Sequence, residues 1–500
     1  MSARHGIPVR GLNATRRSPL YQGAFGRMFR DVPQAQFGNT EEENRQNLTR
    51  LGQVMIAPFS KPKDGKNEKE ESGIPALYTY FGQFVDHDIT FDPASSLQRQ
   101  SDPEALVDFR TPAFDLDSIY GRGPDDQPYL YNGPGFLLGG GVGGGSDKNA
   151  TDVPRNEMGS ALIGDPRNDE NAIVTQLHGL FLRFHNRTVA ENPRLPFEDV
   201  QQIVRLHYQY VVINDFLPRI VSAPVLEALK TDGLYDAKKL KWFRWRNEPF
   251  MPVEFSVAAY RMGHSMVRSG YRLNDHPETL LPIFPVRAQG LNEGLTGFRA
   301  LNRAWGLDWA RFIDVEQRLY EGDKKADERR LQFAFKIDTS LVDPLGDLPP
   351  EVIRSGPTSL PARNLLRGWR LGLPSGQSVA QAMLLEPLKD SEILFATPGG
   401  TADIIKATGS DVFKGNCPLW TYILAEAMHN AEGEKLPVKG GEFEIKTPKL
   451  GPVGGRIVAE VFLGLLFGDG FSLLRRSPKW RPSGAEKYGL KDFVRYALGD

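Results

Sequence analysis

The chain has 500 residues, of which 40% are hydrophobic and 25% are charged, as is usual for a soluble globular protein with a large core. Its 62 acidic and 61 basic residues nearly cancel, which argues against nucleic acid or an anionic membrane as a partner. Cys417 is the single cysteine, so no intrachain disulfide forms. Residues 1–17 are polar and basic without an apolar run, so we expect no signal peptide, and the location stays open between the cytoplasm and leaderless export.

The hydrophobic pattern predicts one mainly α domain, large and helical, with long loops and little β structure. We expect residues 1–45 to form an irregular N-terminal segment and residues 46–500 to form the domain. No apolar stretch is long enough to span a membrane. Amphipathic periodicity predicts helices at Pro75–His87, Ala172–Glu191, Phe197–Asp215, Val253–Arg268, Ser378–Leu385 and Gly455–Phe467.

The first predicted helix carries polar side chains opposite its apolar stripe. Gln83, Asp86 and His87 have the i, i+3, i+4 spacing that places them on one face, where they can form an acid–base site. Asp88 points toward the apolar side, and a carboxylate there needs a partner such as a cation. A solvated polar face is the competing interpretation.

Oxygen-bearing residues alternate in the segment from Thr111 to Gly121. Thr111, Ala113, Asp115 and Asp117 can converge from one side of a loop, and closely spaced oxygen ligands suit Ca²⁺. The segment lacks the glycine and the final glutamate of an EF-hand. An acidic turn is the alternative.

The segment Gly164–Asn186 precedes and enters a long helix. Arg167 and Glu170 are three residues apart, and Asn168 or Asp169 is expected to cap the helix. Two histidines within that helix, at 178 and 185, are expected to be buried packing residues.

Two further helical segments pair an arginine with a possible ligand. Arg261 and His264 share one face, and small neighbouring residues let a flat group approach; a neutral histidine is a common axial ligand of haem iron. Asn364 and Arg367 have the same spacing, and an asparagine carbonyl can accept the second ring proton of a ligating histidine. For His264 alone, an ordinary helix histidine is the alternative.

The order, type and spacing of these segments resemble the animal haem peroxidases of the peroxidase–cyclooxygenase superfamily. The resemblance begins near residue 16, ends with the apolar helix after residue 449, and therefore covers most of the chain. It implies a haem b peroxidase that reduces hydrogen peroxide through an oxoferryl intermediate. The donors would be halides and thiocyanate (iodide, thiocyanate, bromide) and phenols.

The resemblance also implies a role for each matching residue. His87 would be the distal acid–base residue, Arg167 would stabilise charge during O–O cleavage, and Gln83 would order water or halide. His264 would bind the iron with Asn364 as its hydrogen-bond partner. The remaining roles would be held as follows: Arg261 and Arg367 on the haem propionates, Asp86 and Glu170 in ester links to haem, and Asp88, Thr111, Ala113 (through its carbonyl), Asp115 and Asp117 around calcium.

The chain departs from the family pattern at several positions. Asn171 stands where myeloperoxidase has the methionine of a third haem link, Asp117 stands where a serine is usual, and Thr90 replaces an acidic residue near the haem edge. The many cysteines of the mammalian enzymes are absent, which suggests a bacterial member.

Two alternatives stay open. A fatty-acid dioxygenase of the cyclooxygenase branch needs a tyrosine three residues before the proximal histidine; here Arg261 holds that position, and Tyr260 is one place off. A non-catalytic protein that keeps the fold is the other alternative, although His87, Arg167 and His264 are all present. The oligomeric state stays open.

Overall fold

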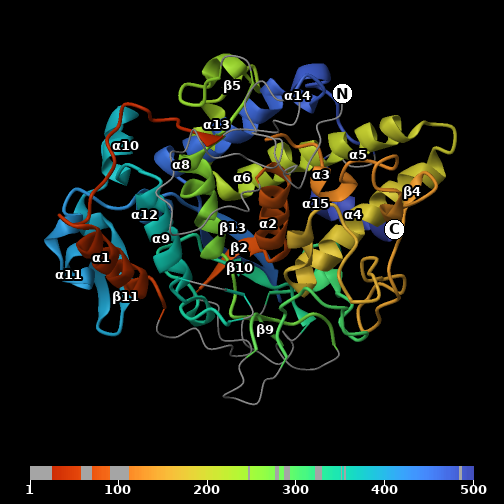
Figure 1. The fold of residues 1–500 in the computed structure, drawn as a ribbon, viewed down its shortest axis with the longest axis horizontal. Helices are drawn as coiled ribbons and strands as arrows, with labels where there is room; N and C mark the ends of the chain where they lie inside the picture. Colours follow the sequence, from red (N-terminus) through yellow and green to blue (C-terminus); the bar gives the residue numbers. More distant parts are fainter. Residues whose placement is uncertain are drawn as a thin grey trace, which may run out of the picture.

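The computed structural model describes residues 25–57, 70–90, 112–245, 248–275, 281–285, 293–320, 329–350, 352–353, 356–483 and 487–499. Within these ranges helices joined by long loops make up the molecule, and every sheet has two strands, so the expected mainly helical fold is confirmed (Figure 1). None of the helices within these ranges is long and apolar enough to cross a bilayer.

The α-helices are α1 (Glu41–Val54), α2 (Leu77–Ile89), α3 (Asp117–Tyr120), α4 (Ala172–Glu191), α5 (Phe197–Val211), α6 (Leu217–Ile220), α7 (Ala223–Glu227), α8 (Val253–Ser256), α9 (Leu360–Arg370), α10 (Gly376–Ala382), α11 (Ile404–Thr408), α12 (Leu419–Met428), α13 (Pro452–Gly468), α14 (Leu473–Arg476) and α15 (Leu490–Leu498). A π-helical segment, η4 (Val212–Phe216), and two 3₁₀ segments, η3 (Pro166–Asp169) and η6 (Ala259–His264), matter for the site.

The strands pair as β1 (Phe25–Gly26) with β7 (Met251–Pro252), β2 (Glu71–Pro75) with β10 (Phe333–Phe335), β3 (Tyr131–Asn132) with β4 (Gly135–Phe136), β5 (Lys230–Thr231) with β6 (Leu234–Tyr235), β8 (Gly270–Tyr271) with β9 (Leu281–Pro282), β11 (Leu394–Thr397) with β12 (Gly400–Asp403), and β13 (Ala431–Val438) with β14 (Gly441–Pro448). The β1–β7 pair is parallel, and it ties residues 25–26 to the chain just before α8. The expected boundary at residue 45 stays a prediction.

Most of the predicted helices are present with small shifts at their ends. The helix α4 has the predicted bounds, α2 begins and ends two residues later than predicted, and α5 runs on through η4 into α6. The helices α10 and α13 overlap their predicted ranges.

The continuous helix predicted at Val253–Arg268 is wrong. The helix α8 ends at Ser256, Ala258 leaves the helical region with φ −127° and ψ −74°, and η6 follows as a 3₁₀ turn. The break leaves carbonyl groups without helical partners, and the Arg261 Nε donates to the Ser256 carbonyl oxygen over 3.1 Å. The turn therefore changes the direction of the chain at Arg261 and His264, while the Ser256 carbonyl oxygen keeps a hydrogen-bond partner.

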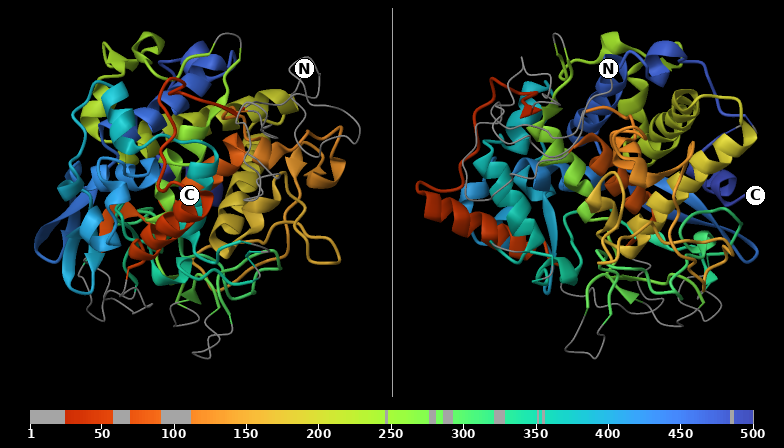
Figure 2. Two further views of the ribbon diagram at one scale, coloured as in Figure 1. Left: turned by 60° about the vertical axis from the view of Figure 1, so that its left-hand side comes forward. Right: turned by 45° about the vertical axis from the view of Figure 1, so that its right-hand side comes forward.

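The helix α2 lies at the centre of the molecule (Figure 1). Apart from Gln83 and Asp86, all its residues are buried. Phe84 stacks on Phe181 of α4 with ring centroids 4.4 Å apart, and α4 in turn packs on α15 through Phe184 and Phe493. Figure 2 shows α4 between the central helix and the outside, with the green loop region around β8 and β9 at the lower end.

Candidate functional site

A cavity of about 530 Å³ lies between the central helix α2 and the turn η6. It is lined by residues from several parts of the chain that are far apart in sequence. The polar residues at its wall include Thr79, Gln83, Asp86, His87, Arg167, Glu170, Asn171, Arg261 and His264. The structure thus brings most of the predicted site residues together, and Asn364 joins them through a contact to His264.

The polar face of α2 borders this cavity. Gln83 and Asp86 are half-buried, and the His87 side chain is only 6% exposed. The interpretation of a solvated polar face is therefore wrong. A helix that is otherwise buried keeps these three side chains in place because its remaining residues pack into the core.

His87 is held from behind by Asn168. The imidazole Nδ1 lies 2.8 Å from the Asn168 Oδ1, and both side chains are buried. Its Nε2 lies 3.5 Å from the Glu170 Oε1, which is beyond ordinary hydrogen-bond length. The ring therefore has one tightly bound nitrogen and one nitrogen near a carboxylate at the cavity.

Arg167 is fixed by the end of α2 and by Asp165. Its Nη2 donates to the His87 and Thr90 carbonyl oxygens over 2.8 and 2.6 Å, and to the Asp165 Oδ2 over 2.8 Å. Burial opposes the charge of the guanidinium, but the carboxylates of Asp165, Asp86 and Glu170 together outweigh it and raise the pKa of Arg167. Arg167 is therefore a permanent, positioned cation at the cavity wall.

Gln83 bridges Glu170 and Asn171. Its Nε2 donates to the Glu170 Oε1, and its Oε1 accepts from the Asn171 Nδ2 over 3.2 Å. Asn171 also caps α4, because its Oδ1 accepts from the backbone N–H groups of residues 173 and 174. The predicted cap at Asn168 or Asp169 is wrong, since η3 precedes α4 and those side chains are engaged elsewhere.

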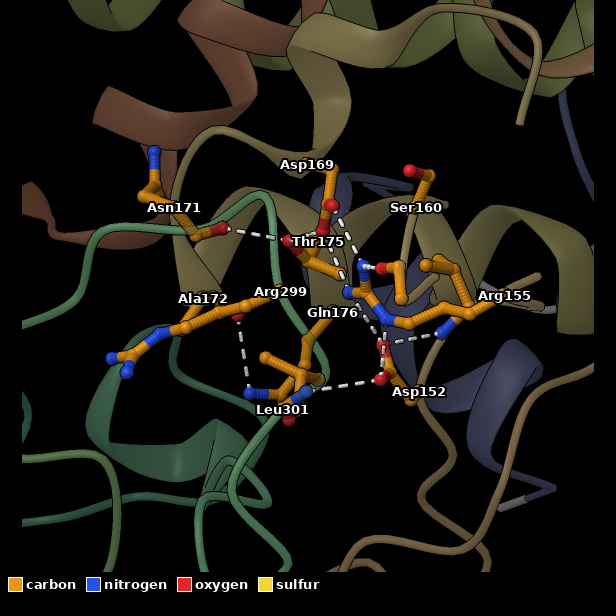
Figure 3. Close-up of polar contacts among 12 residues, drawn as sticks. Asp152, Arg155, Ser160, Asp169, Asn171, Ala172, Thr175, Gln176, Arg299 and Leu301 are labelled. Atoms are coloured by element: carbon orange, nitrogen blue, oxygen red, sulfur yellow. Dashed lines mark hydrogen bonds and ion pairs between the residues drawn. The ribbon is translucent and has the colours of Figure 1, made fainter. Parts of the chain in front are cut away.

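A buried ion cluster holds the η3 segment in place (Figure 3). Arg155 lies between two carboxylates, donating to both Asp169 oxygens over 2.7 Å and to both Asp152 oxygens over 2.8 and 3.0 Å. Thr175 of α4 donates to the Asp169 Oδ1 over 3.1 Å. These bonds hold Asp169, the residue between Asn168 and Glu170, on the side away from the cavity.

A strand-like segment at residues 295–298 runs beside the η3–α4 junction. The Phe298 N–H donates to the Asp169 carbonyl oxygen over 2.6 Å, and the Gly297 N–H donates to that of Glu170 over 2.9 Å. A Cβ at Gly297 would overlap the Asp169 carbonyl oxygen, so only glycine fits. Phe298 follows in the left-handed region at φ 55°, 61% exposed, and lines the cavity.

His264 and Asn364 meet on the other side of the cavity. The His264 Nδ1 lies 2.8 Å from the Asn364 Nδ2, and the Asn364 Oδ1 accepts from the Arg261 Nη1 over 3.4 Å. Burial, reinforced by the charge of Arg261, lowers the pKa of His264 to about 3, so the ring is neutral as iron ligation requires. The expected pairing is present, but the amide nitrogen faces the ring; ligation through Nε2 needs the reverse amide orientation, with the oxygen accepting the Nδ1 proton.

Two half-buried arginines lie together near His264. Burial and the neighbouring charge of Arg367 lower the pKa of Arg261 to about 10. Two guanidinium groups held close in a partly buried place form a site for an anion, because an anion between them removes their mutual repulsion. Haem carries two such anions in its propionates.

The residues present fit a haem group. Gly263 lines the cavity beside His264, and a Cβ built there meets no atom within 4 Å, so open space borders this turn. A neutral histidine, two cations and a largely apolar cavity wall match an iron ligand, two propionates and a flat macrocycle.

The predicted calcium residues are only partly within the described ranges. Thr111 lies outside them. Asp88 is fully buried and accepts from the Leu116 and Ser118 N–H groups and the Ser118 hydroxyl over 3.2–3.3 Å, where the αL residue Leu116 bends the loop. Asp115 accepts from the Asp117 N–H over 3.2 Å. Among the described residues no three acidic, histidine or cysteine side chains form a metal-binding group.

Sequence reasoning missed three residues that support the site. Asn168 binds His87, Asp165 pairs with Arg167, and Arg155 anchors Asp169. The alternation of acidic and basic residues at 165–170 was a signal for the first two, because polar residues rarely cluster before a buried helix without partners. The histidines at 178 and 185 are buried, as expected.

The model of the family described as animal haem peroxidase matches residues 98–396, which is more than half of the chain. The chain therefore belongs to the animal haem peroxidase family, as its resemblance predicted.

Relatives and solved structures agree with this family. A peroxidase-like protein of Margaritifera margaritifera is 34% identical over 179 residues, which cover 31% of this chain and 22% of that protein. Eosinophil peroxidase of Mus musculus is 26% identical over 223 residues, 43% of this chain and 28% of that protein. The chain thus matches less than a third of the length of these relatives.

The fold is shared with two enzyme types. Peroxidase A from Dictyostelium discoideum superimposes with a TM-score of 0.59 at 16% identity, covering 100% of this chain and 97% of that one. A fatty acid alpha-dioxygenase of Oryza sativa gives a TM-score of 0.51 at 16% identity, covering 90% and 76%. At this identity the likeness describes the fold alone.

Proposed function

We propose that the chain is a haem peroxidase that reduces hydrogen peroxide and oxidises small anions and phenols. The observation that carries the proposal is the cavity with His87 and Arg167 on one wall and His264, paired with Asn364, on the other. His264 would ligate the iron, and Arg261 and Arg367 would pair with the propionates. The bound haem supplies the iron at which the O–O bond of peroxide is broken.

His87 and Arg167 have different roles in the cleavage of peroxide. The Nε2 of His87 takes a proton from the first peroxide oxygen and returns it to the departing oxygen, which leaves as water. Arg167, whose position is fixed by Asp165 and by two carbonyl groups, stabilises the negative charge that develops as the bond breaks. Gln83 is held by Glu170 and Asn171, so its amide can order water or an anion beside His87.

The variant His87→Ala tests this role. With haem still bound, the stopped-flow rate of reaction with peroxide should fall by about 10²–10⁴-fold, as expected for loss of a positioned acid–base group. The control is Arg122→Ala, which should leave the rate unchanged because the Arg122 side chain is on the surface and 41% exposed. An unchanged rate in His87→Ala would refute the proposal.

The residue at position 171 determines which anions we expect the protein to oxidise. A methionine at this position would form a sulfonium link that withdraws electron density from haem, whereas Asn171 caps α4 and binds Gln83. We therefore expect iodide, thiocyanate and bromide to be oxidised, and chloride poorly or not at all. A taurine-chloramine assay near neutral pH checks this, and chlorination as efficient as bromination would refute it.

Ester links to haem would use Asp86 and Glu170. Both line the cavity, and each link would join a carboxylate oxygen to a haem methyl carbon with loss of two hydrogen atoms, which one peroxide molecule oxidises to water. After peroxide treatment, haem should stay with the denatured protein in mass spectrometry. Complete release from the treated wild type would count against the links.

Calcium would bind between Asp88 and the loop of Ala113, Asp115 and Asp117, with Thr111 completing the set. Support comes from the hard oxygen donors and from the buried Asp88 carboxylate facing that loop. Metal analysis of active protein should find one calcium per chain, and finding none would refute this.

The dioxygenase alternative is less well supported. Arg261, rather than a tyrosine, stands three residues before His264, and the Tyr260 hydroxyl donates to the Gly82 carbonyl oxygen over 3.1 Å. Oxygen uptake with linoleate in the absence of peroxide would favour it over the peroxidase.

A further inference from the structure

Three buried side chains form a continuous hydrogen-bonded chain behind the cavity. The His87 Nδ1 lies 2.8 Å from the Asn168 Oδ1, and the Asn168 Nδ2 lies 3.1 Å from the Nδ1 of His178. His87 is 5% exposed, and Asn168 and His178 are fully buried. They come from α2, η3 and α4, so the three hydrogen-bonded side chains connect these three elements.

The direction of the hydrogen bonds follows from the orientation of the Asn168 amide, whose oxygen faces His87 and whose nitrogen faces His178. Burial lowers the pKa of His178 to about 3, so its ring is neutral and its Nδ1 can accept from the Asn168 amide nitrogen. An amide oxygen only accepts, so the proton of the neutral His87 ring lies on Nδ1.

We infer that Asn168 is a positioning residue for His87: its amide oxygen holds the ring with the proton on Nδ1 and the Nε2 lone pair toward the cavity, while its amide nitrogen is bound to His178. The inference rests on the proposed function, because a proton acceptor facing the cavity matters only if peroxide reacts there. Turning the amide over would place the proton on Nε2 and remove the base.

The other groups around His87 do not set its tautomer. The Glu170 Oε1 is 3.5 Å from Nε2 and accepts from Gln83. Arg167 donates to the backbone carbonyl oxygen of His87, and the Asp86 Oδ1 accepts from the Thr90 hydroxyl. Asn168 thus makes the shortest bond that the structure gives to either ring nitrogen.

The ring proton can be observed directly in the haem-free chain. The protein has 8 histidines, so ¹⁵N-histidine labelling gives few ring signals, and His87→Gln and His178→Gln assign the two that matter. At about pH 8.5, where histidine is neutral, His87 of the wild type should carry its proton on Nδ1. A proton on Nε2 would overturn the inference without any variant having to fold.

The variant Asn168→Leu removes both hydrogen bonds at similar volume. It should convert the His87 signal to a mixture or to the Nε2-protonated form, and it should slow the reaction of the haem-loaded chain with peroxide by about 10–100-fold, the usual effect of losing such a supporting partner. The KM for the reducing donor should stay constant. Asn168→Asp retains an acceptor and should restore the tautomer and most of the rate.

Asn186→Leu is the matched control. Asn186 is a half-buried asparagine of α4 that binds backbone groups of Phe136 over 2.6 and 3.0 Å, so its loss destabilises the fold without affecting His87. It should leave the tautomer and the peroxide rate unchanged. If Asn168→Leu behaves like this control, the inference is wrong. A wild type that has the Nδ1 proton but does not react with peroxide would refute the proposed function and still support the assigned tautomer.

Discussion

Arg155 should be one of the most costly single residues to remove from this fold. Its side chain is 8% exposed and lies between Asp152 and Asp169, whose side chains are 10% and 3% exposed (Figure 3). Arg155→Met leaves two buried carboxylates near each other without their shared cation. Breaking a buried ion pair from one side costs about 3–5 kcal/mol, which is a large part of a typical net stability of about 5–15 kcal/mol.

Urea unfolding of the haem-free chain, followed by circular dichroism, measures this cost. Arg122→Met is the control, because Arg122 pairs with Asp126 on the surface with exposures of 41% and 52%, and such pairs contribute about 0–1 kcal/mol. Arg155→Lys should recover only part of the loss, since one ammonium cannot form two forked contacts. A loss in Arg155→Met that matches the Arg122 control would refute the reasoning.

Three further outcomes are expected. His264→Ala should abolish the Soret band of the haem-loaded chain, and an unchanged spectrum would rule out the axial role. Burial raises the pKa of Glu426 from 4.5 to about 7. The folded chain therefore keeps a proton that the unfolded chain has lost, and stability falls by about 3 kcal/mol, at about 1.4 kcal/mol per unit, as the pH rises from about 4.5 to about 7. Glu426→Gln should flatten the pH dependence of the unfolding midpoint over this range. Phe298→Gly should relieve the strain of the left-handed backbone and raise the free energy of unfolding by about 1 kcal/mol. It should also lower kcat/KM for phenols more than for iodide. Equal effects on both donors would exclude contact between the Phe298 ring and phenols.

The local sequence pattern was sufficient to predict the helices that are regular and deeply buried. The period of apolar residues in α4 predicts its bounds because the helix is buried along most of its length and begins at a capping asparagine. The same reasoning placed Gln83, Asp86 and His87 on one face of α2. The family resemblance then grouped residues that periodicity alone could not connect.

Pattern was insufficient where long-range contacts decide the geometry. The break between α8 and η6 contains no proline that would predict it, and the Ser256 carbonyl group there is satisfied by the side chain of Arg261. The bond of His87 to Asn168 joins residues 81 apart, and no local spacing encodes it. The amide orientation of Asn364 depends on Arg261, 103 residues away, so its geometry also lies beyond sequence periodicity.

The dispersed origin of the cavity wall has a consequence for how the protein acquires its haem. His87 and Asn168 are 81 residues apart, and His264 and Asn364 are 100 apart, so neither half of the wall exists until distant parts of the chain have docked. Contacts of such long range form slowly and late, because the intervening loops must close first. Haem added to a refolding chain should therefore bind with the kinetics of the final folding phase, and ribosome-bound chains that end before α9 should be unable to retain it.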